Sequence, residues 1–561
     1  MALKVLRRTR FTSFSQFMRE VGINVPENNS KDKSVDIKPK MISSPGEEIV
    51  DVALFTEGTY PFIRGGVSTV IHQIIEAHPH LTFGIIYIGW DVKVGLESKY
   101  PALPQIKWTK TLFLNEKKKD HNSSFFTNFT NESFNAKVTN ELFLAVEDLK
   151  LGKTKGFEKI YFNYLNPSTR KTSLKQILSS NTFLELLLTM FAKENMSLND
   201  LFWLQKELIH IFYNLTETQY PAARVYHSHT QGYAGFAASL ASLQNQGAFF
   251  LTEHSLYLRD VKNALNEDFN FRKNKYAKKN IQVSAFDLKR KAWQGWFELI
   301  GTWTYNQAAS ISYLYPRIAS EAQQLGSPLS ISSIIPNGIH FQDFSLAREA
   351  QKFRASLRQM PNHIWVISLI GRIVPVKGIL DIIEAAKYMK ENWQQSFRIE
   401  LVGPTDEDMS YFKSCMNKVE SYQLQKVVIF CGPKKVQEYL GQTDLIVLSS
   451  HSEALPMASL EGMATGLPVV STEVGSVADI IHNELAKTGP CGFMSPPKKP
   501  LLLAQNIMKL LDDKNQYNTF SENALVRVQD GYNINHVMKA YGNIYRSLSI
   551  NLKQGEVEFF S

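Results

Sequence analysis

Two glutamates eight positions apart, Glu453 and Glu461, are the first candidates for chemistry. The apolar run Leu445–Leu448 predicts a buried strand, and the polar turn after it carries Glu453. Residues 457–465 predict a short helix with Pro456 in its first turn. In an open α/β sheet, ligands bind at such a turn, beyond the carboxyl ends of the strands. Because free N–H groups at a helix start attract anions, the turn predicts a diphosphate site.

The two carboxylates are expected to have different tasks. Glu461, on the helix, is placed to accept hydrogen bonds from both hydroxyls of a ribose, as the acidic residue of dinucleotide folds does. Glu453 precedes the helix and would bind sugar hydroxyls or stabilise developing positive charge at a reacting sugar. The alternative is that both are ordinary surface acids.

A second loop offers cations of the kind that a leaving diphosphate requires. Residues 371–378 follow a predicted buried strand and precede a helix, and they present Arg372 and Lys377. Arginine offers a bidentate fork and lysine a mobile point charge, and both stabilise departing phosphate oxygens. The alternative is that they are solvated loop cations.

Composition predicts a globular intracellular protein of two domains. The chain has 561 residues, of which 44% are hydrophobic and 20% charged, with a formal net charge of +9. This charge fits a phosphorylated small molecule, an acidic polymer or an anionic membrane face, and it does not demand nucleic acid. Three scattered cysteines, a polar N-terminus and the lack of a long apolar run predict a cytoplasmic location.

Strands that alternate with helices predict an α/β protein with two Rossmann-like doubly wound domains facing each other across a cleft. Residues 1–48 are predicted to be an extension and linker, and 49–338 a first domain with a helical insertion at about 115–215. Residues 339–530 are predicted to bind a nucleotide sugar. Residues 531–561 predict a C-terminal helix for which a return to the first domain is one option.

The individual elements follow from apolar periodicity and from turn residues. The predicted strands are 49–55, 83–88, 223–227, 248–252, 309–314, 331–335, 365–370, 397–402, 427–431, 444–448 and 469–471. The predicted helices are 11–21, 183–193, 198–215, 232–243, 379–392, 408–421, 436–441, 457–465, 477–481, 501–511 and 534–548, with a charged helical stretch up to 308. A further helix is predicted from Ser68, acting as N-cap, to Ala77.

The combined motifs resemble family 4 retaining glycosyltransferases. The features shared with that family are the Gly371-Arg372…Lys377-Gly378 loop, the glutamate pair and Gly466-Leu467-Pro468-Val469-Val470. Further blocks are similar to the PelF group, which is linked to assembly of a bacterial exopolysaccharide. These blocks are Thr56-Glu57-Gly58-Thr59-Tyr60-Pro61, Gly65-Gly66-Val67-Ser68, Thr252-Glu253-His254, Ile335-Pro336-Asn337-Gly338-Ile339 and Gly403-Pro404-Thr405-Asp406-Glu407-Asp408.

The resemblance implies the GT-B fold, with residues 49–338 as the acceptor-side domain. It also implies a retaining, metal-independent hexosyltransferase without a cofactor. Its donor would be UDP-glucose or a related UDP-hexose, and its acceptor a glycan or another molecule, with membrane-associated polysaccharide assembly proteins as candidate partners and no nucleic acid. The site residues that it implies are Arg372 and Lys377 on the diphosphate, Glu461 on the ribose, Glu453 and His229 at the donor sugar, Gly65 and Gly66 near the phosphates, and Leu455, Met457 and Ala458 at the helix start.

Three positions depart from the family pattern. Gly462 stands where family 4 members usually have Ala, and Gly475-Ser476 with Asp479 stands where they commonly have Gly-Gly followed by Glu. Ser255 follows Glu253-His254, where the PelF group usually has Gly. The family resemblance therefore supports glycosyltransferase activity more strongly than it supports a particular donor.

Other interpretations remain open at this point. The Asp406-Glu407-Asp408 run has the D-x-D pattern of a metal site, although N-capping of the following helix is a simpler explanation. For the protein as a whole, the rivals are a non-catalytic scaffold that binds polysaccharide or assembly proteins, and a nucleotide-sugar epimerase.

Overall fold

The computed structural model describes residues 48–90, 96–115, 132–168, 177, 182–183, 185, 210–277, 284–482 and 488–554. The chain forms two compact units, each of which is described by itself. Unit 1 comprises Met1–Ser312, Ala319–Ser333 and Gly542–Ser561, and unit 2 comprises Tyr313–Ile318 and Ile334–Tyr541. The predicted helix at 11–21 and most of those at 183–193 and 198–215 lie outside the described residues.

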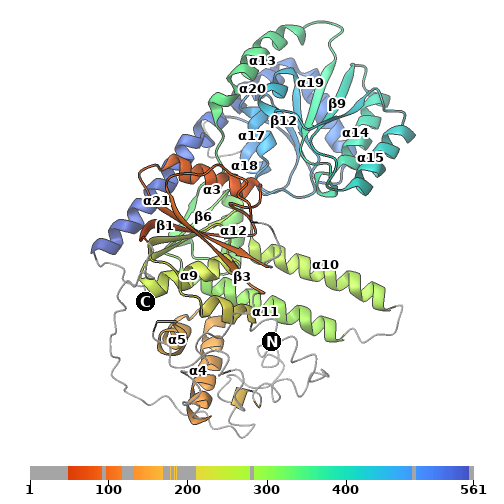
Figure 1. Ribbon diagram of the computed structural model, residues 1–561. Helices are drawn as coiled ribbons and strands as arrows, with labels where there is room; N and C mark the ends of the chain where they lie inside the picture. The colour runs from red at the N-terminus through yellow and green to blue at the C-terminus, as the bar shows by residue number, and fades with distance from the viewer. Residues whose placement is uncertain are drawn as a thin grey trace. The chain divides into compact units, whose positions relative to one another are not determined.

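A seven-stranded sheet forms the centre of unit 1, in the order β3-β2-β1-β4-β5-β6-β7. Neighbouring strands from β3 to β5 run parallel. The strands are β1 (Val50–Glu57), β2 (Phe83–Gly89), β3 (Ile106–Phe113), β4 (Ala223–Ser228), β5 (Ala248–Glu253), β6 (Ser310–Tyr313) and β7 (Ser332–Ile334). The described helices of this part of the chain include α3 (Gly66–Ala77), α4 (Glu132–Lys150), α5 (Lys155–Ile160), α9 (Tyr233–Asn245), α10 (Tyr257–Ala277), α11 (Ser284–Gln307) and α12 (Pro316–Gln324). In Figure 1, α10 and α11 run side by side as two long helices.

Unit 2 contains a six-stranded parallel sheet in the order β10-β9-β8-β11-β12-β13. Its strands are β8 (Trp365–Ile370), β9 (Phe397–Val402), β10 (Val428–Gly432), β11 (Leu445–Leu448), β12 (Val469–Thr472) and β13 (Gly492–Ser495). Its described helices include α13 (Ser345–Leu357), α14 (Ile379–Asn392), α15 (Met409–Ser421), α16 (Val436–Tyr439), α17 (Met457–Met463), α18 (Val477–His482), α19 (Pro500–Asp512) and α20 (Lys514–Gly531). The strand order reverses between β8 and β11, which is where such sheets bind ligands.

Both faces of the unit 2 sheet are covered. Leu445 and Val447 of β11 belong to a buried core that α14 and α19 complete. Ile446 lies between them and points the other way, since a Cβ built on Gly462 of α17 would lie 2.3 Å from its Cγ1. This arrangement explains the near-continuous apolar strands. The prediction of two Rossmann-like doubly wound domains is confirmed.

Several predicted boundaries were wrong. Helix α3 begins at Gly66 with Gly65 as N-cap, and the predicted cap Ser68 instead donates its hydroxyl to the carbonyl of Ile63 (2.7 Å). Pro456 is the N-cap of α17 rather than its first helical residue. The prediction did not include the edge strands β3 and β13, nor helices α12, α13 and α20.

Helix α21 (Ile534–Gln554) is longer than the predicted 534–548, and it contributes residues to both units, with the division after Tyr541. In unit 1, Tyr545 of α21 contacts Nδ1 of buried His227 through its hydroxyl (2.7 Å). Among the described residues, no helix combines the length and apolar character required to cross a membrane.

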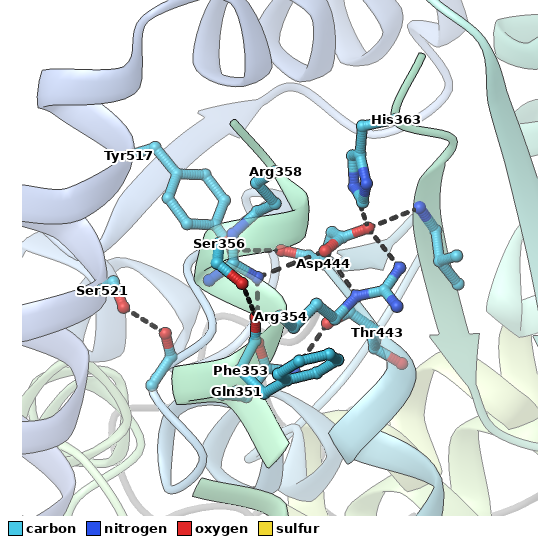
Figure 2. Close-up of polar contacts among 12 residues, drawn as sticks. Gln351, Phe353, Arg354, Ser356, Arg358, His363, Thr443, Asp444, Tyr517 and Ser521 are labelled. Carbon is cyan, nitrogen blue, oxygen red and sulfur yellow. Dashed lines mark hydrogen bonds and ion pairs between the residues drawn. The ribbon is translucent and has the colours of Figure 1, made fainter. Parts of the chain in front are cut away.

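A buried charge cluster lies at the amino end of β11 (Figure 2). The carboxylate of Asp444 is fully buried and accepts two hydrogen bonds from Arg354 (2.6 and 2.7 Å), and one each from Arg358 (3.2 Å) and the backbone N–H of Val366 (2.9 Å). His363 lies 3.0 Å away. Burial alone would raise the pKa of Asp444, but the bonds from His363 and Arg354 outweigh burial and lower it to about 2.

We expect Asp444→Asn to destabilise unit 2 by about 3–5 kcal/mol, because two mostly buried guanidinium groups lose their counter-charge. Glu349→Gln is the matched control: it breaks only an exposed pair with Lys352 and should cost less than about 1 kcal/mol. The loss of stability in both variants is measured by urea titration, with hydrogen exchange of the β8 and β11 amides as the readout. Because the pKa of Asp444 is lowered on folding, the wild-type contribution should be lost as the pH falls from about 4 towards 2. Equal losses in both variants would contradict the role of this cluster.

Candidate functional site

The turn between β11 and α17 is firmly fixed to its neighbours within unit 2. The Ser449 hydroxyl donates to the carbonyl of Lys377 (2.9 Å), and the hydroxyl of Thr472 donates to the carbonyl of Ser450 (2.6 Å). Gly475 has a positive φ of 53°, and a Cβ there would lie 1.9 Å from the carbonyl oxygen of Glu453. Glycine at 475 therefore allows the loop after β12 to pack directly against the backbone of Glu453.

Lys377 and Glu453 meet, although 76 residues separate them. The Lys377 Nζ donates to Oε1 of Glu453 at 2.5 Å, and the hydroxyl of Ser450 donates to the same oxygen at 2.7 Å. The two side chains are only 21% and 14% exposed. The strand ends of β8 and β11 thus bring together a predicted phosphate cation and the predicted sugar-binding carboxylate.

Arg372 has a different partner. Its Nη1 donates to both oxygens of Glu407 (2.5 and 2.8 Å), which follows β9, and both side chains are about half exposed. Asp408, next to Glu407, accepts the backbone N–H of Tyr411 at 2.9 Å and caps α15, as the simpler interpretation of this acidic run predicted. Within the described parts of the chain, no group of three or more histidine, cysteine, aspartate or glutamate side chains is arranged to hold a metal ion.

Glu461 is the predicted ribose ligand, and in the described structure it has no hydrogen bond or ion pair. Its carboxyl is largely removed from solvent, and burial raises its pKa. A partly desolvated carboxylate without a partner is a strong acceptor for hydroxyl groups. Leu455 is buried before the helix, and Met457 and Ala458 are the first residues of α17, which has only seven residues.

The residue after Glu461 departs from the family pattern for a packing reason. A Cβ at Gly462 would lie 2.3 Å from the Cγ1 of Ile446, so glycine allows α17 to approach β11 closely. At the second departure, Gly475 keeps the family's first glycine, and the Ser476 N–H donates to the carbonyl of Ala454 (3.0 Å), a backbone bond that a glycine at 476 would also form. The structure gives no reason for serine at 476 or aspartate at 479.

In unit 1, His227 at the end of β4 and His229 in the turn after it differ in their hydrogen bonding. Both ring nitrogens of His227 have partners, namely Tyr545 (2.7 Å) and Thr252 (2.8 Å). His229 is buried; its Nδ1 lies 3.0 Å from Nε2 of His254, while its Nε2 has no hydrogen-bond partner in the described structure. This orphaned nitrogen marks His229 as the histidine with capacity for a ligand.

His254 and Glu57 are candidate site residues that we did not assign from the sequence, although both lie in the blocks that carry the family resemblance. Burial lowers the pKa of His254 to about 4, and burial together with the neighbouring histidines lowers those of His227 and His229. Glu57 ends β1 and accepts from the N–H of Ala234 (3.2 Å) and the hydroxyl of Tyr257 (3.1 Å). Burial raises its pKa despite these bonds.

Gly65 and Gly66, the predicted phosphate-approach loop, are the N-cap and first residue of α3. A Cβ built on either meets no described atom within 4 Å. Gly65 has an extended backbone, with φ of 175°, that any residue adopts. No contact or backbone strain in the described chain therefore requires glycine at 65, and the role predicted for these two residues stays a prediction.

Comparison with known proteins identifies the family. The profile described as "Domain of unknown function (DUF3492)" matches residues 50–330, half of the chain. The chain belongs to this family. A second profile, "Glycosyl transferases group 1", matches residues 351–527, which hold Arg372, Lys377, Glu453 and Glu461. Unit 2 of this DUF3492 protein is therefore a group 1 glycosyltransferase domain.

Relatives and solved structures agree with this assignment. The DUF3492 protein is 27% identical over 229 residues to the UDP-Gal:alpha-D-GlcNAc-diphosphoundecaprenol alpha-1,3-galactosyltransferase of Escherichia coli, covering 40% of this chain and 56% of that one. It is 24% identical to the capsular polysaccharide biosynthesis glycosyltransferase CapM of Staphylococcus aureus, covering 39% and 54%. The chain spans about half the length of these curated relatives.

Two solved structures share the fold at low sequence identity. Anabaena HepE in complex with UDP matches with a TM-score of 0.51 at 13% identity, covering 88% of this chain and 99% of that one. Sucrose-phosphate synthase of Thermosynechococcus elongatus matches with 0.51 at 17% identity, covering 89% and 98%. The sequence-based assignment to glycosyltransferases of the GT-B type is confirmed at this level.

The buried histidines predict a pH dependence of unit 1. Their pKa values are lowered on folding, so the unfolded chain binds more protons as the pH falls below 6.5, and stability should decline down to about pH 4. Each such histidine contributes a slope of up to about 1.4 kcal/mol per pH unit. We expect His254→Gln to make the slope shallower by that amount and the exposed-site control His80→Gln to change it less. Hydrogen exchange of β4 and β5 between pH 6.5 and 4 provides the slope; an unchanged slope in His254→Gln would be evidence against buried neutral imidazoles.

Proposed function

We propose that the protein is a retaining glycosyltransferase of family 4, most similar to the PelF group, that moves a hexose from a UDP-linked donor to a glycan or another acceptor. The observation that carries the proposal is the arrangement at the β8 and β11 strand ends of a group 1 glycosyltransferase domain: Lys377 bonded to Glu453, with the acceptor-ready Glu461 eight residues further on. The names of the E. coli relative and of the HepE complex support a uridine nucleotide.

Each residue of this site has a task in the proposal. Glu461 accepts the ribose hydroxyls, and Lys377 and Arg372 neutralise the diphosphate, which departs without the help of a metal. Glu453 binds the donor sugar. Since α17 has only seven residues, its dipole contributes little, and the side-chain cations must stabilise most of the negative charge.

Retention of configuration follows if the acceptor attacks from the face that the diphosphate leaves. The acceptor oxygen forms the new bond to the anomeric carbon, the bond to the phosphate oxygen breaks with its electron pair, and the acceptor proton passes to the departing diphosphate. In unit 1, the Nε2 of His229 has no hydrogen-bond partner in the described structure, and the proposal assigns it to a sugar hydroxyl. The proposal further includes a role in exopolysaccharide synthesis in the cytoplasm, next to membrane-associated assembly proteins.

Replacing Glu461 tests the nucleotide site. We expect Glu461→Ala to weaken UDP binding about tenfold to a hundredfold, because charge-assisted hydrogen bonds to the ribose are lost. Glu438→Ala is the control, since Glu438 is an exposed glutamate paired only with Lys435 in the described structure. Isothermal calorimetry with UDP gives both affinities. Wild-type protein that binds no UDP up to millimolar concentration would favour the scaffold interpretation.

Replacing Lys377 tests the chemistry. We expect Lys377→Ala to lower kcat about a hundredfold or more while UDP affinity changes far less, because the lysine acts on charge that develops as the diphosphate departs. Lys435→Ala, which breaks an exposed ion pair, is the matched control. Turnover is measured by release of UDP with and without acceptor. Conversion of the donor to another UDP-sugar without any acceptor would indicate an epimerase instead.

A further inference from the structure

The strongest unassigned feature is the bond between Arg372 and Glu407. The predicted diphosphate cation is not free in the described structure, because its Nη1 already donates to both carboxylate oxygens of Glu407. Thirty-five residues separate the two in sequence, and neither the family resemblance nor the comparisons assign a role to Glu407. A phosphate must compete with this carboxylate for the same guanidinium group.

The backbone brings the two residues together. The loop after β8 and the loop after β9 are joined by the Ile373 N–H, which donates to the carbonyl of Pro404 (3.0 Å). Gly403 has φ of 154°, and a Cβ there would lie 2.0 Å from the carbonyl oxygen of Gly371. Glycine at 403 therefore permits the close approach of the two loops. Asp408, the next residue after Glu407, caps α15 and so ties the end of this loop to the helix.

The second ion pair of the site shows why this one is exchangeable. Glu453 is 14% exposed and also accepts from Ser450, so removing Lys377 from it would leave a buried charge. Glu407 is 49% exposed, and its hydrogen bonds and ion pair in the described structure are with Arg372. Water can solvate Glu407 as soon as it is released, so its release costs little.

We propose that Glu407 is an internal counter-carboxylate of the donor site, which holds Arg372 in the unliganded protein and is displaced by the diphosphate of the donor. The proposal rests on the proposed function. In this exchange Arg372 releases a singly charged carboxylate and binds a more highly charged diphosphate, so ligands without phosphate gain nothing from the arginine. Glu407 thereby sets the affinity for phosphate-bearing ligands.

The test compares Glu407→Gln with Asp406→Asn. Both remove one negative charge, and Asp406 is exposed and makes no bond in the described structure, so only Glu407→Gln releases Arg372. We expect Glu407→Gln to bind UDP about two- to fivefold more tightly than wild type, more than Asp406→Asn does, with uridine affinity unchanged. The gain should shrink as salt rises from 20 to about 500 mM, because exposed charges are screened. Equal UDP affinities in the two variants would overturn the proposal.

A second measurement does not depend on any nucleotide. Phenylglyoxal modifies accessible arginines, and mass spectrometry of the Arg372 peptide gives its rate of modification. We expect faster modification of Arg372 in Glu407→Gln than in wild type or Asp406→Asn. An equal rate in all three proteins would contradict the proposal that Glu407 holds Arg372 in the unliganded protein, even if UDP binds. Faster modification in a protein that binds no UDP would support the hold and reject the proposed function.

Discussion

The position of the candidate site depends on the buried carboxylate of Asp444. This residue precedes β11, and its bonds to Arg354, Arg358 and the N–H of Val366 fix the amino ends of two neighbouring strands, β8 and β11, to helix α13 and the turn after it. β11 has only four residues, so its other end lies about 13 Å away. The carboxyl ends of these two strands lead into the segments that carry Lys377 and Glu453. The Asp444 cluster at the amino ends of these strands thus helps to fix the geometry of the Lys377–Glu453 ion pair beyond their carboxyl ends.

The candidate site residues of the two units differ in their electrostatic environment. In unit 2, the predicted phosphate cations Arg372 and Lys377 are each paired with a carboxylate, that of Glu407 and that of Glu453. In unit 1, the histidines near the ends of β4 and β5 are kept neutral by burial. A paired cation can exchange its partner for a phosphate, whereas a neutral imidazole can only donate or accept a hydrogen bond.

The sequence was sufficient to predict what burial on two faces dictates. Strands β8 and β9 were predicted with their observed bounds, because β8 is nearly all apolar and β9 alternates apolar residues such as Leu401 with polar ones. The missed strands β3 and β13 are the edges of their sheets, and in β3 the exposed residues Lys107, Thr109 and Thr111 alternate with partly buried ones. Ser68 was assigned as a cap from residue preference, but the observed start of α3 lies two residues earlier. Of the site, the residue types and strand ends were predictable; the partner of Arg372 was not, because Glu407 reaches it through the packing of two loops.

The contact between Gly462 and Ile446 has a consequence for how this site can change. Helix α17 carries Glu461, and its distance from β11 is set by a glycine that leaves no room for a Cβ against Ile446. The alanine common in family 4 therefore cannot be introduced at 462 without a smaller side chain at 446. The two positions form an epistatic pair, in which the second substitution is neutral or harmful according to the first. The distance of Glu461 from the sheet is consequently set in part by two residues that are not among the predicted ligand contacts.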